Sequence, residues 1–141
     1  MPRSTVRVTG GQVSFGDCFS MGRNKIGYTL FPQRSAPRLE VYGGTMTVQN
    51  SVNMADDRGA YTVVEVTNGT LVAGMALTGR VGGNEDTTNT VRVTGSGTFI
   101  LNGSFTNKRD IVSHVMVSDG GVLSLARLVN EAGRVTVVLA V

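Results

Sequence analysis

Apolar residues along this chain recur in short alternating bursts that are separated by glycine-rich corners. The segment VRVTGSGTFILN, residues 91–102, shows the pattern: two valines flank an arginine, a Gly-Ser-Gly corner follows, and a second alternating burst begins. Side chains that alternate in this way point to opposite faces of a β-strand. No segment keeps an apolar spacing of three and four residues, so the sequence predicts strands and little helix.

The same phrase occurs five times, with corners of Gly or Asn that tolerate the positive φ of a sharp bend. The first strand of each copy carries two apolar residues around one outward residue. That outward residue is charged in four of the five copies, which predicts a solvated outer face: Arg7, Glu40, Glu65, Arg92 and Met116. A second strand adds two apolar positions. A third apolar column is expected at Phe19, Val52, Leu77, Phe105 and Val129.

A repeated unit of three short strands predicts the fold class. Equivalent positions in the five copies are occupied by valines 8, 41, 66, 93 and 117, which are 33, 25, 27 and 24 residues apart. Repeats of this length are typical of solenoids. We therefore expect an all-β, single-stranded parallel β-helix of about five three-strand turns, forming one domain over residues 1–141. An antiparallel β-sandwich is the alternative, but it gives no reason for the whole unit to recur. The domain is expected to be a segment of a longer protein or an assembling subunit.

The insertions between copies are the expected place for function, because in a solenoid they leave from one corner and line one edge. The longest, residues 22–38, contains basic residues, no acidic residue, and aromatic side chains. The candidate ligand-binding residues for an anionic glycan are Arg23, Lys25, Tyr28, Arg34 and Arg38. The alternative is a lid that folds over the end of the coil and buries its aromatic side chains.

Two acidic pairs lie in successive later insertions: Asp56 with Asp57, and Glu85 with Asp86. Glycoside hydrolysis uses two carboxylates, one as acid and one as base or nucleophile, so these are the candidate catalytic residues. Acidic residues in glycine-rich loops are also ordinary solvated turn residues. Adjacency alone does not provide the raised pKa that a catalytic acid needs, and we expect no enzyme activity.

Composition limits the partners. The net charge is +3, from 13 basic and 10 acidic residues, which is too small a bias to predict nucleic-acid binding. The chain has one cysteine, Cys18, and one histidine, His114, so no disulfide framework, metal site or cofactor is expected. Cys18 is interpreted as a small buried thiol. No apolar run approaches the length of a membrane span.

The segments LEVYGGTMTVQN, residues 39–50, and VEVTNGTLVAGM, residues 64–75, resemble the degenerate repeats of bacterial autotransporter passengers and adhesin-type surface proteins. The resemblance covers nearly the whole chain. It implies a right-handed β-helix in an extracellular or cell-surface location, part of a stalk or adhesin, and it carries over no catalytic residue.

These observations lead to a non-catalytic structural or adhesive β-helical module, whose partners are glycans or other surface proteins. One alternative is a β-helix that processes or binds polysaccharide through the acidic or basic insertions. Another is a self-assembling fibre subunit, a homo-oligomer formed through the ends of the coil, where unpaired strand edges can meet another copy.

Overall fold

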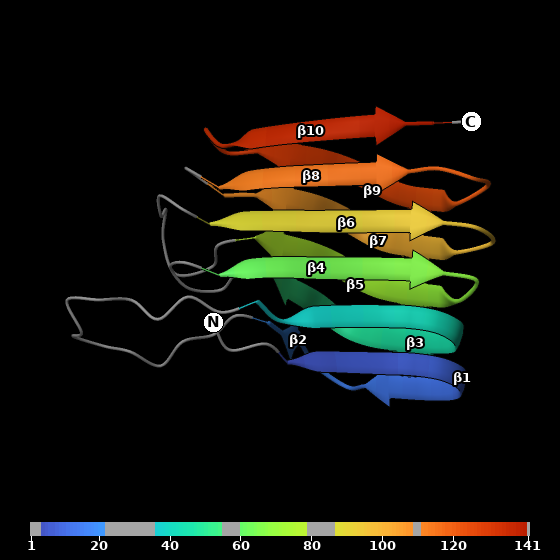
Figure 1. The fold of residues 1–141 in the computed structure, drawn as a ribbon. Coiled ribbons are helices and arrows are strands. Elements are labelled where there is room, and N and C mark those ends of the chain that lie inside the picture. The colour runs from blue at the N-terminus through green and yellow to red at the C-terminus, as the bar shows by residue number, and fades with distance from the viewer. Residues whose placement is uncertain (1–3, 22–35, 55–59, 79–86, 109–110, 141) are drawn as a thin grey trace.

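A computed structural model describes residues 4–21, 36–54, 60–78, 87–108 and 111–140, and within these ranges the chain forms β-strands and no helix (Figure 1). The strands are β1 (Thr5–Phe15), β2 (Phe19–Ser20), β3 (Arg38–Met54), β4 (Tyr61–Thr67), β5 (Thr70–Thr78), β6 (Thr88–Thr94), β7 (Thr98–Asn107), β8 (Val112–Val117), β9 (Val122–Asn130) and β10 (Arg134–Leu139). Among the described residues, no helix exists that could cross a membrane.

The strands coil around one axis as a β-solenoid. In Figure 1, β4, β6, β8 and β10 run in one direction across the front, and β5, β7 and β9 return behind them as the chain climbs, which makes the coil right-handed. All pairings are parallel and join each turn to the next. The parallel pairing contradicts the alternative of an antiparallel sandwich.

Each turn has three sides. The first side contains residues 5–8 of β1, residues 38–41 of β3, and then β4, β6, β8 and β10. The second side contains residues 12–15, 45–48, 70–73, 98–101 and 122–125. The third side contains residues 19–20, 51–54, 75–78, 104–107 and 127–130.

The predicted columns are confirmed on the first two sides. On the first side the pairing stacks Val8, Val41, Val66, Val93 and Val117. On the second side it stacks Val13, Met46, Leu71, Phe99 and Leu123. The alternation of the sequence therefore specified which residues face the inside of the coil, although Val13 in the first turn is 36% exposed.

The third column was wrong in two turns. Ala76 pairs with Val52 and Phe105, and Leu128 pairs with Phe105, where Leu77 and Val129 were expected. The bend before the third side contains two residues in the turns of β3 and β7 but one residue in those of β5 and β9. A fixed offset of four residues cannot follow a bend that varies in length, because each one-residue slip moves a side chain to the other face.

The number of fully packed turns is lower than the repeat count. Residues 38–54, 61–78 and 88–107 form about three turns that have a parallel neighbour on both sides. Within the described residues, β1 pairs on one side only, as β9 does. The β-helix class is thus confirmed, whereas five equally packed turns are not.

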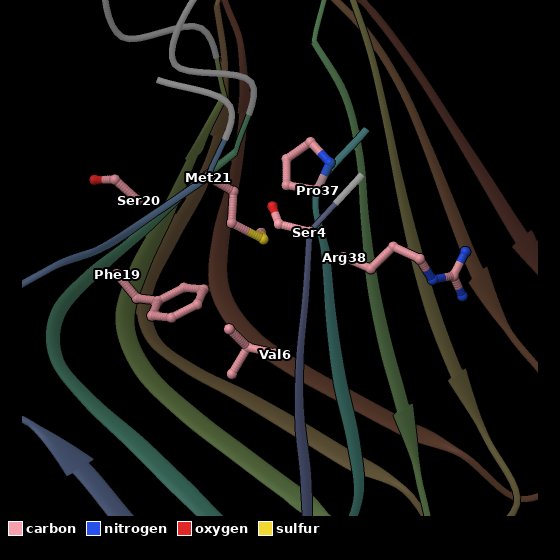
Figure 2. A pocket seen from close by; sticks show the side chains of 7 residues that line it. All are labelled: Ser4, Val6, Phe19, Ser20, Met21, Pro37 and Arg38. Carbon is pink, nitrogen blue, oxygen red and sulfur yellow. The ribbon is translucent and has the colours of Figure 1, made fainter. Parts of the chain in front are cut away.

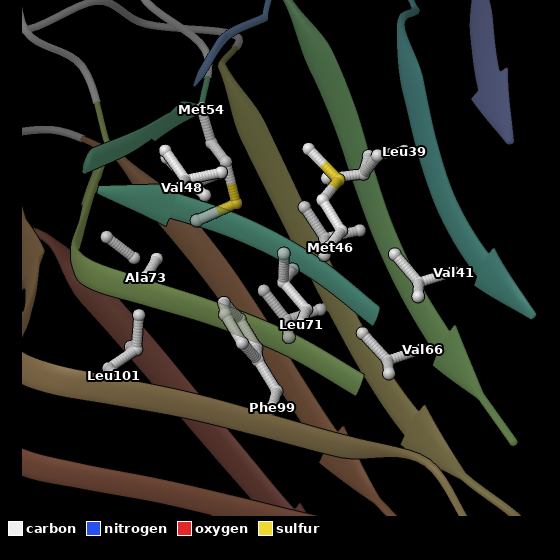
Figure 3. Packing of buried hydrophobic residues seen from close by; sticks show 14 of the residues in the cluster. Leu39, Val41, Met46, Val48, Met54, Val66, Leu71, Ala73, Phe99 and Leu101 are labelled. Atoms are coloured by element: carbon white, nitrogen blue, oxygen red, sulfur yellow. The ribbon is translucent and has the colours of Figure 1, made fainter. Parts of the chain in front are cut away.

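The core lies inside these middle turns (Figure 3). Leu39 and Met46 of β3, Leu71 of β5 and Phe99 of β7 are fully buried and come from three successive turns. Burying a side chain of this size stabilises the fold by about 1.5–3 kcal/mol. Because each layer rests on the next, the stability of a turn depends on its two neighbours.

The corners between the first and second sides need glycine. Gly44 has a φ of +70°, and a Cβ placed there would collide with the carbonyl oxygen of Gly11 in the turn below. Asn68 occupies the equivalent bend with a φ of +60°. The corners predicted from the sequence therefore combine a left-handed backbone with close stacking of successive turns.

Candidate functional site

The outer face of the first side carries a network of charged residues that joins three turns. The Glu40 carboxylate accepts hydrogen bonds from Arg7 Nε at 2.7 Å and from Arg38 Nε at 3.1 Å. Arg38 Nη2 also donates to Glu65 Oε2 at 3.0 Å, and the Tyr42 hydroxyl donates to Glu65 Oε1 at 3.2 Å. We call these five residues the charged ladder.

The predicted solvated outer face is confirmed at Arg7, Arg92 and Met116, and Glu40 corrects it at one position. Glu40 is only 4% exposed, although Arg92 in the same column is exposed. Two guanidinium groups bind the carboxylate, and Arg7 also lies 5.2 Å from the centre of the Tyr42 ring, within reach of a cation–π interaction. Paired charges can be buried where an isolated carboxylate could not.

The protonation states follow from these contacts. The hydrogen bond from Arg7 holds the pKa of the Glu40 carboxyl below its usual value, although burial acts in the opposite direction. Burial raises the pKa of the Tyr42 phenol, and the nearby Glu40 and Glu65 raise it further. A carboxyl group of lowered pKa stays ionised at neutral pH, so Glu40 is unsuited to act as a general acid.

Of the predicted glycan-binding residues, Arg38 is the one that the structure describes. Its guanidinium binds two carboxylates of the chain itself, Glu40 and Glu65. Arg23, Lys25, Tyr28 and Arg34 lie outside the described residues. Glycan binding by this set remains a prediction.

The candidate catalytic residues also lie outside the described part of the chain: Asp56, Asp57, Glu85 and Asp86. The described residues that flank the insertions do meet at one corner, because Met54, Thr78, Asn107 and Asn130 pair in one row at the end of the third side. The prediction that the insertions leave from one corner is therefore confirmed for their attachment points.

A second polar cluster lies inside the coil at this same corner. Asn107 Oδ1 accepts hydrogen bonds from Thr78 Oγ1 at 2.8 Å and from Ser113 Oγ at 2.6 Å. Asn107 Nδ2 donates to the carbonyl of Ile111 at 2.9 Å and to Asn130 Oδ1 at 3.0 Å. Asn89 extends the cluster by donating to Ser113 Oγ at 3.4 Å.

We call this cluster the polar corner. It was not predicted from the sequence, although the alternation of the strands contains the signal for it. Thr62, Asn89 and Ser113 stand two residues before the first inward valine of their strands, so the alternation points them inward as well. Thr62 donates to Asn89 Oδ1. All three are buried, with exposures of 0–1%. The cluster satisfies the polar groups of a corner and offers no open surface to a substrate.

A cavity of about 240 Å³ lies at the first turn, next to the first side of the coil (Figure 2). Figure 2 shows Val6, Phe19 and Met21 converging on it, whereas Ser20 and Arg38 extend to opposite sides. Ser4 and Pro37 complete its lining. Val6, Phe19, Met21 and Pro37 form the apolar part of the lining, Ser4, Ser20 and Arg38 form its polar part, and no carboxylate lies among these residues.

Cys18 is exposed, which corrects the interpretation of a buried thiol. It lies between β1 and β2, where Ser51 Oγ donates to its sulfur at 3.2 Å. His114 lies within β8, exposed, and pairs with Thr90 and Thr136 in the ladder of the first side. Among the described residues, no group of three or more His, Cys, Asp or Glu side chains could hold a metal ion.

Comparison with known proteins finds no matching family model, no matching curated protein and no matching solved structure.

Proposed function

We propose that this chain is a non-catalytic structural and adhesive β-solenoid module of an extracellular or surface-exposed protein. The observation that carries the proposal is the charged ladder. Arg7, Glu40 and Glu65 come from successive turns; Arg7 pairs with Glu40, and Arg38 bridges the two carboxylates. The most concentrated ionisable chemistry of the described residues therefore joins turns together.

The polar corner supports the same conclusion. Thr78, Asn107 and Ser113 hydrogen-bond one another inside the coil and are buried. Buried polar groups that are fully partnered stabilise one arrangement of the backbone and are poorly accessible to a ligand. The resemblance to adhesin repeats is the basis for placing the module at a cell surface, with glycans or other surface proteins as its partners.

Incubation of the 141-residue chain with a panel of acidic and neutral polysaccharides tests the proposal. We expect no release of reducing or unsaturated sugars. Release that disappears when Asp56, Asp57, Glu85 and Asp86 are replaced by Asn or Gln would show an enzyme and overturn it.

Binding to an immobilised glycan panel tests the adhesive part separately. If the basic insertion binds anionic glycans, replacing Arg23, Lys25 and Arg34 with Ala should abolish retention, and binding should weaken with salt. The matched control is Arg92→Ala, which removes one exposed positive charge from the coil. If the unsubstituted chain and the Arg92→Ala control both fail to bind any member of the panel, the module is structural and not glycan-adhesive.

A further inference from the structure

Apolar residues on all three sides of the coil are exposed or only partly buried at the end that carries β9 and β10. Val137 is 48% exposed and Leu139 is 75% exposed, although both lie on the core side of β10, opposite Val115 and Val117. Leu123 and Leu125 are partly buried there, and Leu128 is 46% exposed. We call these residues the end surface: Leu123, Leu125, Leu128, Val137 and Leu139.

The end surface has the shape of a step. The first side carries β10 above β8, whereas on the second and third sides the last described strand is β9, which pairs with β7. In Figure 1, β10 is the uppermost strand of the front row and β9 lies behind it. The first side is therefore higher by one rung, about 4.8 Å.

Within the described part of the chain, the edge of β10 carries none of the usual protection against pairing. After Arg134 its sequence is VTVVL, without charge or proline. Val138 on its outer face is 46% exposed, next to Met116, which is 39% exposed. The outer face of β10 also carries Arg134 and Thr136, so contact is expected at the edge of the strand, because unprotected edges pair with another chain.

A second copy stacked head to tail would fit this step poorly. Its first turn has all three sides at one level, with residues 5–8, 12–15 and 19–20. If residues 5–8 paired with β10, the rungs above β9 would be missing on both the second and the third side. Such gaps leave apolar side chains without neighbours, which costs stability.

An inverted copy fits the step better. Consider a twofold axis that is perpendicular to the axis of the coil and passes near the corner between the first and second sides. Rotation about it would place the first side of each copy, which ends in β10, over the second side of the other copy, which ends one rung lower in β9. β10 would then lie antiparallel to residues 122–125 of the second copy, and the same contact would form twice. Only the third side would lack a rung, and Leu123 and Leu125 would be covered by Val137 and Leu139 of the other copy.

We propose that two copies of this chain associate through their end surfaces about a twofold axis, each placing β10 on the exposed edge of β9 of the other. The association closes at two copies, because the same surface is used by both. It stands whether the module is adhesive or only structural.

Sedimentation velocity of the 141-residue chain, from about 1 to about 200 µM, tests the proposal because association is governed by mass action. We expect conversion of monomer to dimer without larger species. Val137→Lys should raise the dissociation constant at least about tenfold, because it places a charge in an apolar contact. Leu139→Lys, at a more exposed position, should have the same effect, and far-UV circular dichroism verifies that each variant is folded.

The matched control is Val6→Lys, an equally apolar position, 44% exposed, on the first turn. The dimer should survive this change. Species that grow beyond two copies and are abolished by Val6→Lys would show head-to-tail stacking and overturn the proposal. A monomer at every concentration would overturn it as well.

Hydrogen exchange gives a second readout that does not depend on a variant. Amides of β10 and of residues 122–125 should exchange more slowly at high concentration than at low concentration, while those of β1 should not change. Equal exchange of β10 at both concentrations in a dimeric sample would show that another surface forms the dimer.

Discussion

At the scale of single residues, Glu40 shows how a side chain on the outer face can be buried. It pairs with Arg7 of the turn before and with Arg38 of its own strand, and Arg38 continues to Glu65 of the turn after. An ion pair on an exposed surface contributes little, but removing a carboxylate that is covered by two guanidinium groups takes a partner from both of them, although Arg38 keeps Glu65. The charged ladder therefore acts as a link between turns.

Glu40→Gln should lower the free energy of unfolding by about 1–2 kcal/mol at neutral pH, because it removes charge-assisted hydrogen bonds. The lowered pKa of Glu40 also predicts a pH dependence. The contribution of Glu40 is present above the unfolded pKa, about 4.3, and is lost as the pH falls through the lower folded pKa. Chemical denaturation between neutral pH and the acid range should therefore show a smaller loss for the variant than for the parent chain.

Arg92→Gln is the matched control for this measurement, since Arg92 stands in the same column as Glu40 but is exposed. Its effect on the free energy of unfolding should stay within about 0.5 kcal/mol. Equal losses for the two variants would mean that the charged ladder does not link the turns.

Asn107 joins more polar groups than any charged residue on the outer face. Asn107→Ala should destabilise the chain by about 2–4 kcal/mol, because Thr78, Ser113 and the Ile111 carbonyl would lose a buried partner. Urea denaturation measures the loss. Asn102→Ala, at an exposed bend of the same strand, should cost far less, and a similar cost at both positions would contradict a special role for the polar corner.

At the scale of elements, the sequence predicted two sides of each turn and misplaced part of the third. Strands of the first and second sides follow a strict alternation, and a corner with Gly or Asn resets it in every copy. The bend before the third side varies between one and two residues, and composition does not show which length is used. The charged ladder could not be predicted either, because the boundary of a strand was misplaced. Arg38 was assigned to the basic insertion, whereas in the fold it is the first residue of β3.

The corners allow a test in which two glycines are compared. Gly44→Ala should destabilise the chain by about 1–3 kcal/mol, because the residue has a positive φ and its new Cβ would meet the Gly11 carbonyl. Gly10→Ala meets nothing within 4 Å and should be nearly neutral. Thermal unfolding of the two variants measures the difference, and equal melting temperatures would contradict the corner geometry.

At the scale of the whole molecule, stability should follow position along the coil. Residues 38–54, 61–78 and 88–107 have a rung on both sides, and their core residues are almost completely buried. β1 carries Val6 at 44% and Val13 at 36% exposure, and β10 carries Leu139 at 75%. In a stack of repeats, each rung is stabilised by its neighbours, so the two end turns should open first.

Hydrogen exchange of the monomer at low concentration measures this gradient. We expect the slowest exchange for amides of the middle turns, and faster exchange for residues 5–15 and 134–139, because opening an end rung exposes only one interface. Phe99→Ala, in the middle of the core, should cost about 3–5 kcal/mol and accelerate exchange in the turns above and below it. Uniform exchange along the coil would mean that all turns open together, and the rungs could then not be treated as units stabilised by their nearest neighbours.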